Sequence, residues 1–281
     1  MDISYVSEIS DTSIKRRSII RPKSQDSLQH PREMFILPKL QSAISYQIEL
    51  WGSQFPPGSK VLDMGCGQQP YRELLIQKRF SYVGFDVIQN DENKVDFLGK
   101  IDDLQLPDML IKNGPYDMIL ATEVFEHVLD WGQAFRNLSR LLGPEGEILI
   151  TCPFLFPIHE TPFDFWRPTP FALAGLSDSQ GFEVKSNQTL GSTTDCLGLI
   201  LGHLIVGMKY QTTTSFWRRI NVSIQQRVLK TLLKGLHSLV KAGWLEANFS
   251  SLNDMYVSNV TVLTHKKVGS PDVLNKHTFG G

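Results

Sequence analysis

The sequence predicts an α/β protein with a doubly wound sheet of seven strands, and three observations predict this fold. Short apolar segments alternate with segments of helical periodicity through most of the chain. The helical segments are long enough to connect neighbouring parallel strands. A glycine-containing turn follows the first apolar segment. Ligands of such sheets bind beyond the carboxyl ends of the strands, so the residues that follow each strand are the first candidates for a functional site.

The elements follow one another in a regular order. Apolar residues recur at helical spacing from Met34 to Trp51, which predicts a first helix ending at Gly52. The seven strands are expected at residues 60–64, 81–86, 94–98, 116–121, 147–153, 182–188 and 256–267. Helices between them are expected at residues 71–80, 131–142 and 170–181. Strands separated by helices of this length imply a parallel sheet.

The composition is that of an ordinary globular protein and excludes several classes. The chain has 281 residues, 41% hydrophobic and 20% charged, with a net charge of −1, so we expect no nucleic-acid partner. Cys66, Cys152 and Cys196 are scattered without metal-ligand spacing, which fits a reducing cytoplasm and predicts neither disulfides nor a metal site. No run of 18 apolar residues occurs, so a spanning helix is not expected.

The chain divides into a main domain with two polar ends. Residues 1–31 lack the apolar segment of a secretory signal and are expected to form a mobile arm. Residues 32–268 are expected to form the domain, with a helical insertion at about 190–250 before the last strand. Residues 269–281 are expected to be a flexible tail.

The turn after the first strand reads VLDMGCGQQPY and occupies the place where a cofactor binds in this fold. Gly65 and Gly67 allow a sharp turn and a close approach of the backbone to a ligand. Pro70 stands where a dinucleotide-binding fingerprint needs its third glycine, which disfavours an NAD-dependent oxidoreductase. Asp63 just before the glycines would repel a pyrophosphate but attract an ammonium group. A second acid, Asp86, ends the next strand, so the two acids suggest a ligand with an amine and a ribose.

With Asp63-Met64-Gly65-Cys66-Gly67, the sequence resembles the class I S-adenosylmethionine-dependent methyltransferases, although Gln69 replaces the third glycine of their first motif. The resemblance implies a Rossmann-like methyltransferase domain that uses S-adenosylmethionine. Asp63, Gly65, Cys66 and Gly67 would then hold the methionine portion of the cofactor. Asp86 would accept hydrogen bonds from the ribose hydroxyls.

Two further segments match the same family. Asp102 or Asp103 would lie beside the adenine, or either could instead cap a helix starting near Leu104. At the end of the fourth strand, Ala121 and Thr122 would lie beside the sulfonium, with Glu123 close behind. Glu123, Glu126 and His127 match the E-x-x-E-H sequence that the family often carries, and His127 could equally serve only to orient the loop.

The segment FPIHETPFDFWRPTP, residues 156–170, follows the fifth strand and is expected on the acceptor side of the crevice. Its prolines limit the collapse of the loop. We expect His159 to act as a general base for a hydroxyl acceptor, with Glu160 or Asp164 fixing its tautomer and Arg167 binding an anionic acceptor. The alternative is that His159, Asp164 and Arg167 form a structural network that holds the loop closed.

The acceptor is less defined than the cofactor. Residues 156–170 are similar to methyltransferases of glycan biosynthesis, which implies O-methylation of a small or glycan-type acceptor. A quinone-like or lipid acceptor could be held by the same aromatic side chains. A catalytically inactive S-adenosylmethionine-binding protein is a further alternative.

The insertion before the last strand is basic, with no acidic residue between Cys196 and Leu245. Helical spacing places one set of apolar residues on one face and basic residues on the opposite one; the apolar set is Ile224, Val228, Leu232, Leu236 and Val240. Residues 216–245 are therefore expected either to cap the site or form a homodimer interface, or to bind an anionic membrane from the cytoplasm.

Overall fold

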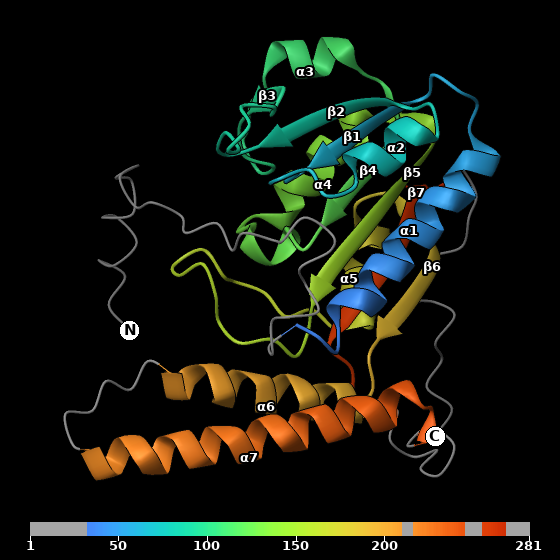
Figure 1. The fold of residues 1–281 in the computed structure, drawn as a ribbon. Helices are drawn as coiled ribbons and strands as arrows, with labels where there is room; N and C mark the ends of the chain where they lie inside the picture. The colour runs from blue at the N-terminus through green and yellow to red at the C-terminus, as the bar shows by residue number, and fades with distance from the viewer. Residues whose placement is uncertain (1–32, 210–215, 245–254, 268–281) are drawn as a thin grey trace, which may run out of the picture.

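The computed structural model describes residues 33–209, 216–244 and 255–267 and confirms the predicted α/β class. Seven strands form one sheet in the order β3-β2-β1-β4-β5-β7-β6, with helices on both faces (Figure 1). The strands are β1 Lys60–Met64, β2 Ser81–Asp86, β3 Phe97–Leu98, β4 Tyr116–Thr122, β5 Leu142–Pro153, β6 Phe182–Leu190 and β7 Ser258–His265. The helices are α1 Leu37–Gln54, α2 Arg72–Gln77, α3 Asp108–Asn113, α4 Trp131–Leu141, α5 Pro170–Ser179, α6 Thr193–Lys209 and α7 Phe216–Lys241, with a short 3₁₀ turn η3 at Phe125–His127. The predicted arm, residues 1–31, and the tail, residues 269–281, lie outside the described residues.

The sheet is mixed, which corrects the expectation of a wholly parallel one. Strands β1 to β5 pair in parallel, whereas β7 lies antiparallel between β5 and β6. The reason is the α6–α7 pair, which leaves and returns at the same end of the sheet. Leu190 at the end of β6 therefore pairs with Ser258 at the start of β7, and the last strand runs backwards.

Two apolar clusters cover the two faces of the sheet. Helices α1 and α2 pack on one face through residues such as Ile44, Trp51 and Leu75. Helices α3, α4 and α5 pack on the other, where Phe135 is fully buried. The alternation of side chains along the central strands supplies both clusters, since neighbouring residues point to opposite faces.

Several predicted boundaries were wrong by a few residues. Helix α1 continues through Gly52 to Gln54, and the amide of Phe55 closes it by donating to the carbonyl of Trp51. The third strand is only Phe97–Leu98, and β5 begins at Leu142, directly after α4. No helix starts near Leu104; α3 begins at Asp108, after Pro107.

The insertion forms the two long helices α6 and α7, which lie beside each other beyond one end of the sheet (Figure 1). The expected apolar face of α7 is wrong in part. Leu236 and Val240 of the expected face pack with Leu229 and Leu233 into a cluster that contains Phe35, whereas Ile224, Val228 and Leu232 are exposed. Within the part of the chain that the structure describes, neither these helices nor any other is long and apolar enough to cross a membrane.

Candidate functional site

The glycine turn after β1 is built mainly by backbone hydrogen bonds. The amides of Gly65 and Cys66 both donate to the carbonyl of Phe85, at 2.8 and 3.1 Å, which ties the turn to the end of β2. Gly65 has a φ of +75°, and a Cβ there would lie 2.3 Å from a methyl carbon of Val124. Gly67 has a φ of +49° but no heavy atom within 4 Å of where its Cβ would lie. The turn is therefore closed at Gly65 and open at Gly67.

Gln69 occupies the place of the third glycine in the family's motif and takes on a structural task. Its φ is +57°, the left-handed conformation that a glycine would adopt easily. Its side-chain amide donates to the carbonyl of Lys94 at 2.7 Å, which fixes the loop after β2. Cys66 is buried beside it. Burial, reinforced by the carboxylates of Asp63 and Asp86, raises the pKa of the Cys66 thiol, which stays neutral.

The two predicted acids lie in different environments. Asp63 is buried and accepts a hydrogen bond from the hydroxyl of Tyr82 at 2.7 Å. Burial, followed by the charge of Asp63, raises the pKa of Tyr82, so this phenol remains a donor. Asp86 is half-buried at the end of β2 and accepts from the amide of Gly67 at 2.8 Å. Its other oxygen accepts from the amide of Ile88 at 3.3 Å. A carboxylate has more acceptor positions than these two bonds use, so Asp86 can also accept from a ligand hydroxyl.

Asp102 and Asp103 do not cap a helix, which rules out that alternative. The carboxylate of Asp103 accepts from the amide of Lys100 at 2.9 Å and closes a local turn. That of Asp102 accepts from the amide of Asp130 at 3.2 Å. Both therefore lie in loops between strands, and a contact with adenine stays a prediction.

Strand β4 ends at Thr122, one residue later than expected, and Glu123 follows it. Thr122 is buried, and Glu123 has a φ of +51°. The amide of Glu123 donates to the carbonyl of Thr151 at 3.0 Å, and its carboxylate accepts from the hydroxyl of Ser258 at 3.0 Å. The start of β7 thus helps to orient an acid that the sequence places after β4.

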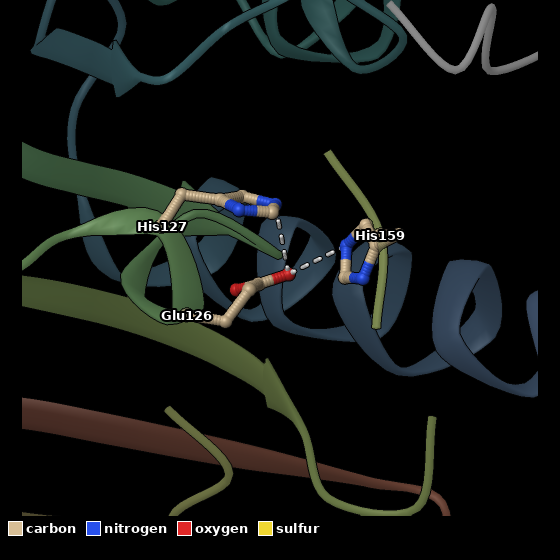
Figure 2. A group of neighbouring side chains, drawn as sticks. All are labelled: Glu126, His127 and His159. Carbon is tan, nitrogen blue, oxygen red and sulfur yellow. Dashed lines mark ion pairs between the residues drawn. The ribbon is translucent and has the colours of Figure 1, made fainter. Parts of the chain in front are cut away.

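Glu126, His127 and His159 form a cluster next to these residues (Figure 2). Oε1 of Glu126 lies 3.6 Å from Nε2 of His127 and 3.8 Å from Nε2 of His159. Glu126 is fully buried and also lies near the thiol of Cys152. The 3₁₀ turn η3 supplies two of the three side chains and the proline-rich loop supplies the third.

The proline-rich loop is held by Asp164. Its carboxylate accepts from the amide of His159 at 2.8 Å and from two nitrogens of Arg167 at 2.6 and 2.7 Å. Burial favours the neutral acid, but the bonds from Arg167 and His159 outweigh it and lower the pKa of Asp164. The predicted pairing of His159 with Asp164 is thus formed at 3.2 Å, whereas Glu160 lies nearer His127, at 3.9 Å. Burial and the nearby His127 lower the pKa of His159 despite Asp164, so its imidazole tends to be neutral.

Arg167 is committed to the loop itself. Besides Asp164, its guanidinium donates to the carbonyls of Phe156 at 3.3 Å and Trp166 at 2.7 Å. These contacts fit the alternative in which Arg167 belongs to a structural network. Binding of an anionic acceptor by Arg167 stays a prediction.

A cavity of about 120 Å³ joins the two parts of the site. Pro70 and Tyr71 line it next to the glycine turn, and His159 and Glu160 line it from the proline-rich loop. The start of α1 completes the wall with Ile36, Leu37 and Leu40, and Glu33 precedes them. Helical periodicity is the one signal for these residues in the sequence, because their contribution to the cavity depends on where α1 packs.

A larger apolar groove of about 670 Å³ lies beside this cavity and shares Phe156 with it. Phe154, Leu155 and Pro157 line one side, and α6 lines the other through residues including Leu199 and Leu204. The hydrophobic residues of the insertion thus reach the acceptor side of the site.

The seven-stranded sheet with an antiparallel last strand, the glycine turn after β1 and the acid ending β2 define a class I S-adenosylmethionine-dependent methyltransferase fold. The particular family follows from comparison with known proteins: residues 37–184 match the model of a family described as a methyltransferase domain. The match spans more than half of the chain, and the protein belongs to this family.

Individual relatives are more distant. The chain is 27% identical over 101 residues to a ubiquinone biosynthesis O-methyltransferase of Caulobacter sp. strain K31, covering 33% of this chain and 40% of that protein. It is 29% identical over 124 residues to an (S)-coclaurine N-methyltransferase of Thalictrum flavum subsp. glaucum, covering 40% of this chain and 34% of that protein. Among solved structures, an O-methyltransferase from a trans-AT PKS multienzyme of Brevibacillus brevis has a TM-score of 0.49 at 15% identity, over 84% of this chain and 79% of that one. The matches span less than half the length of the two curated relatives.

Proposed function

We propose that this protein transfers a methyl group from S-adenosylmethionine to a hydroxyl oxygen of a small or glycan-type acceptor. The observation that carries the proposal is the cavity that Pro70 and Tyr71 line at the end of the glycine turn and that the cluster of Glu126, His127 and His159 also lines. A methyl donor at the turn and an acceptor at the cluster would then meet at this cavity. Methyl transfer needs chiefly this alignment and the exclusion of water.

The residues of the turn fit S-adenosylmethionine. The open side of Gly67 leaves room for a ligand close to the backbone, and the half-buried carboxylate of Asp86 is placed to accept from ribose hydroxyls. Asp63 would supply a negative charge near the ammonium group from its buried position behind the turn. The cofactor, when bound, supplies a methyl group on a positively charged sulfur.

The cluster would accept the proton of the acceptor hydroxyl. Nδ1 of His159 lies 3.2 Å from both the carbonyl of Pro157 and the carboxylate of Asp164, which accept hydrogen bonds and so place the ring proton on Nδ1. Nε2 is then the basic nitrogen, and it faces the cavity side where Glu126 lies. Glu126 would stabilise the imidazolium that forms when Nε2 takes the proton.

Calorimetry with S-adenosylhomocysteine tests the cofactor half of the proposal. We expect micromolar binding of S-adenosylhomocysteine and no binding of NAD, and a preference for NAD would contradict the proposal. A screen of hydroxyl acceptors with radiolabelled S-adenosylmethionine, including nucleotide sugars and glycans, tests the other half. His159→Ala should retain cofactor binding and lose turnover; normal turnover by this variant would remove His159 from the role of base.

The apolar groove favours a second candidate, an acceptor with a lipid or quinone-like part. Phe156 borders both the groove and the cavity, so an apolar chain in the groove would place its polar end near His159. The names of two relatives, both ubiquinone biosynthesis O-methyltransferases, support this candidate. Ile224, Val228 and Leu232 on α7 are exposed beside Arg227 and Lys230, as expected for contact with an anionic lipid surface.

Two measurements separate the candidates. Methylation of polyprenylated phenols in preference to sugars would support the lipid-type acceptor, and the reverse preference would contradict it. Co-sedimentation with vesicles containing anionic lipid at low salt should show binding that Lys230→Glu with Lys234→Glu weakens. Light scattering in the same buffer reports whether the exposed face of α7 instead pairs two copies of the chain, which would contradict the membrane contact.

A further inference from the structure

Three side chains at one end of the cavity direct potential metal ligands at a common point (Figure 2). One ligand atom from each of Glu126, His127 and His159 lies within 4.8 Å of the other two. The separations of 3.6 and 3.8 Å between Oε1 of Glu126 and the two Nε2 atoms exceed an ordinary hydrogen bond of about 2.7–3.2 Å. Two ligands that each lie about 2.1 Å from a cation in tetrahedral geometry are about 3.4 Å apart. The two separations from Glu126 are therefore within a few tenths of an ångström of the spacing that one shared cation requires, and the two histidine nitrogens lie no more than 4.8 Å apart.

The orientation of both imidazoles suits metal binding. Nδ1 of His127 lies 2.6 Å from the carbonyl of Phe163, which can only accept, so Nδ1 carries the proton and Nε2 carries the lone pair of the neutral ring. His159 is held in the same way by Pro157 and Asp164. Nη2 of Arg167 also approaches Nδ1 of His159 at 3.4 Å, but this arginine nitrogen donates to the carboxylate of Asp164 at the shorter distance of 2.7 Å. Metal-binding histidines characteristically donate their second N–H to a carbonyl or carboxylate.

The surrounding charges favour a cation at this point. Glu123 and Glu160 line the same cavity as Glu126, and the carboxylate of Glu160 lies 3.9 Å from Nε2 of His127. Arg167, the positive side chain that approaches His159, is paired with Asp164. Three carboxyl groups thus lie around the two imidazoles, and a divalent ion would offset the charge of their ionised forms.

We propose that Glu126, His127 and His159 bind a divalent transition-metal ion of the Zn²⁺ or Co²⁺ type, with its remaining positions open to the cavity. Two imidazole nitrogens and one carboxylate select such ions over Mg²⁺ and Ca²⁺, which prefer all-oxygen sites. The sequence predicted no metal site, because His159 lies in a different loop from Glu126 and His127 and only the fold brings it to them.

The role of this ion rests on the proposed O-methyl transfer, whereas its binding does not. A metal-bound acceptor hydroxyl loses its proton more easily, as metal-bound water does. The O–H bond would break with its proton passing to the carboxylate of Glu160. The oxygen would then form its bond to the methyl carbon as the S–CH₃ bond breaks and its electron pair returns to sulfur. Nε2 of His159 cannot bind the ion and accept the proton at once, so in the metal-bound protein His159 is a ligand instead of a base.

Calorimetric titration of the chelator-treated full chain with Zn²⁺ tests the binding directly. We expect one ion per chain, with affinity reduced at least about 100-fold in His127→Gln and in His159→Gln, since each removes one ligand. His265→Gln is the matched control, because His265 lies at the end of β7 and stacks on Phe182. Co²⁺ should give the visible absorption bands of a low-coordinate site, and Mg²⁺ should bind far more weakly. Glu126→Gln should also lose Zn²⁺ affinity, and it counts as a test only if circular dichroism shows that the variant is folded. If it is not folded, the two histidine variants decide whether the metal site exists.

The outcomes separate this inference from the proposed function. Absence of stoichiometric Zn²⁺ binding, or an equal loss in the His265→Gln control, would overturn the metal site. Binding of S-adenosylhomocysteine with turnover that is insensitive to chelators would overturn the catalytic role of the ion and leave methyl transfer intact. Failure to bind S-adenosylhomocysteine would instead contradict the proposed function, and the Zn²⁺ titration would still decide the metal site by itself.

Discussion

The glycine turn and the proline-rich loop border the same cavity, but different forces hold them in place. In the turn, backbone amides of Gly65, Cys66 and Gly67 donate to partners at the end of β2. In the loop, the carboxylate of Asp164 accepts hydrogen bonds from the amide of His159 and the guanidinium of Arg167, which belong to the same segment. The turn is thus positioned by the sheet, whereas the loop is positioned by this side-chain network together with hydrogen bonds from outside the loop, such as those from His127 to the carbonyl of Phe163 and from Asn259 to the carbonyl of Pro168. Changes to the turn should therefore affect folding and cofactor binding, and changes to the loop should affect turnover.

The largest expected effect comes from Gly65→Ala. The new Cβ would lie 2.3 Å from Val124 and would also sit at a φ of +75°. Strain of the backbone and overpacking should together destabilise the fold by about 3–4 kcal/mol, measured by chemical unfolding. Gly67→Ala is the matched control with open space at its Cβ, and it should cost only about 1 kcal/mol. Equal losses in the two variants would show that contact with Val124 does not hold the turn.

Asp86→Ala should weaken binding of S-adenosylhomocysteine by about 100-fold while the fold is retained. The substitution removes both the acceptor for the Gly67 amide and the acceptor expected for the ribose, and each bond to a charged group contributes about 1.5–3 kcal/mol. Calorimetry measures the loss. Asp91→Ala removes an exposed charge nearby and should change the affinity less than about threefold. A comparable loss of affinity in both variants would mean that Asp86 acts through its charge at a distance and not through a hydrogen bond to the ribose.

The contrast between the two regions also explains what the sequence could predict. The succession of strands along the chain and the positions of Asp63, Gly65 and Asp86 near strand ends were predictable, because they follow from local sequence patterns. The antiparallel β7 and the exposure of Ile224 and Val228 on α7 were not, because they depend on how α6 and α7 return to the sheet and pack on Phe35. Spacing in the sequence likewise carried no information on the approach of His159 to Glu126.

Arg167→Lys tests the loop and should have a smaller effect. Lysine cannot reproduce the two bonds to Asp164 or the bond to Phe156, so the loop should lose about 1–2 kcal/mol of local stability. We expect kcat to fall about tenfold, with binding of S-adenosylhomocysteine unchanged, because the turn does not depend on this network. Arg140→Lys on the exposed side of α4 is the control and should match the parent protein. Loss of cofactor affinity in Arg167→Lys would contradict the independence of the two regions.

Thiol labelling offers the finest comparison, since one cysteine belongs to each region. Cys66 lies in the turn and Cys152 lies just before the proline-rich loop, and burial raises the pKa of both thiols. Burial and then Asp195 also raise the pKa of Cys196, to about 11, so at pH 8 only about one molecule in a thousand carries its thiolate, the reactive form. All three should react slowly with a thiol reagent in the folded protein and rapidly after unfolding. In Arg167→Lys the rate at Cys152 should rise a few-fold while that at Cys66 stays the same, as mass spectrometry of the labelled peptides would show. A faster labelling rate at both cysteines would mean that the loop and the turn open in one cooperative unit, so that weakening the loop also weakens the turn.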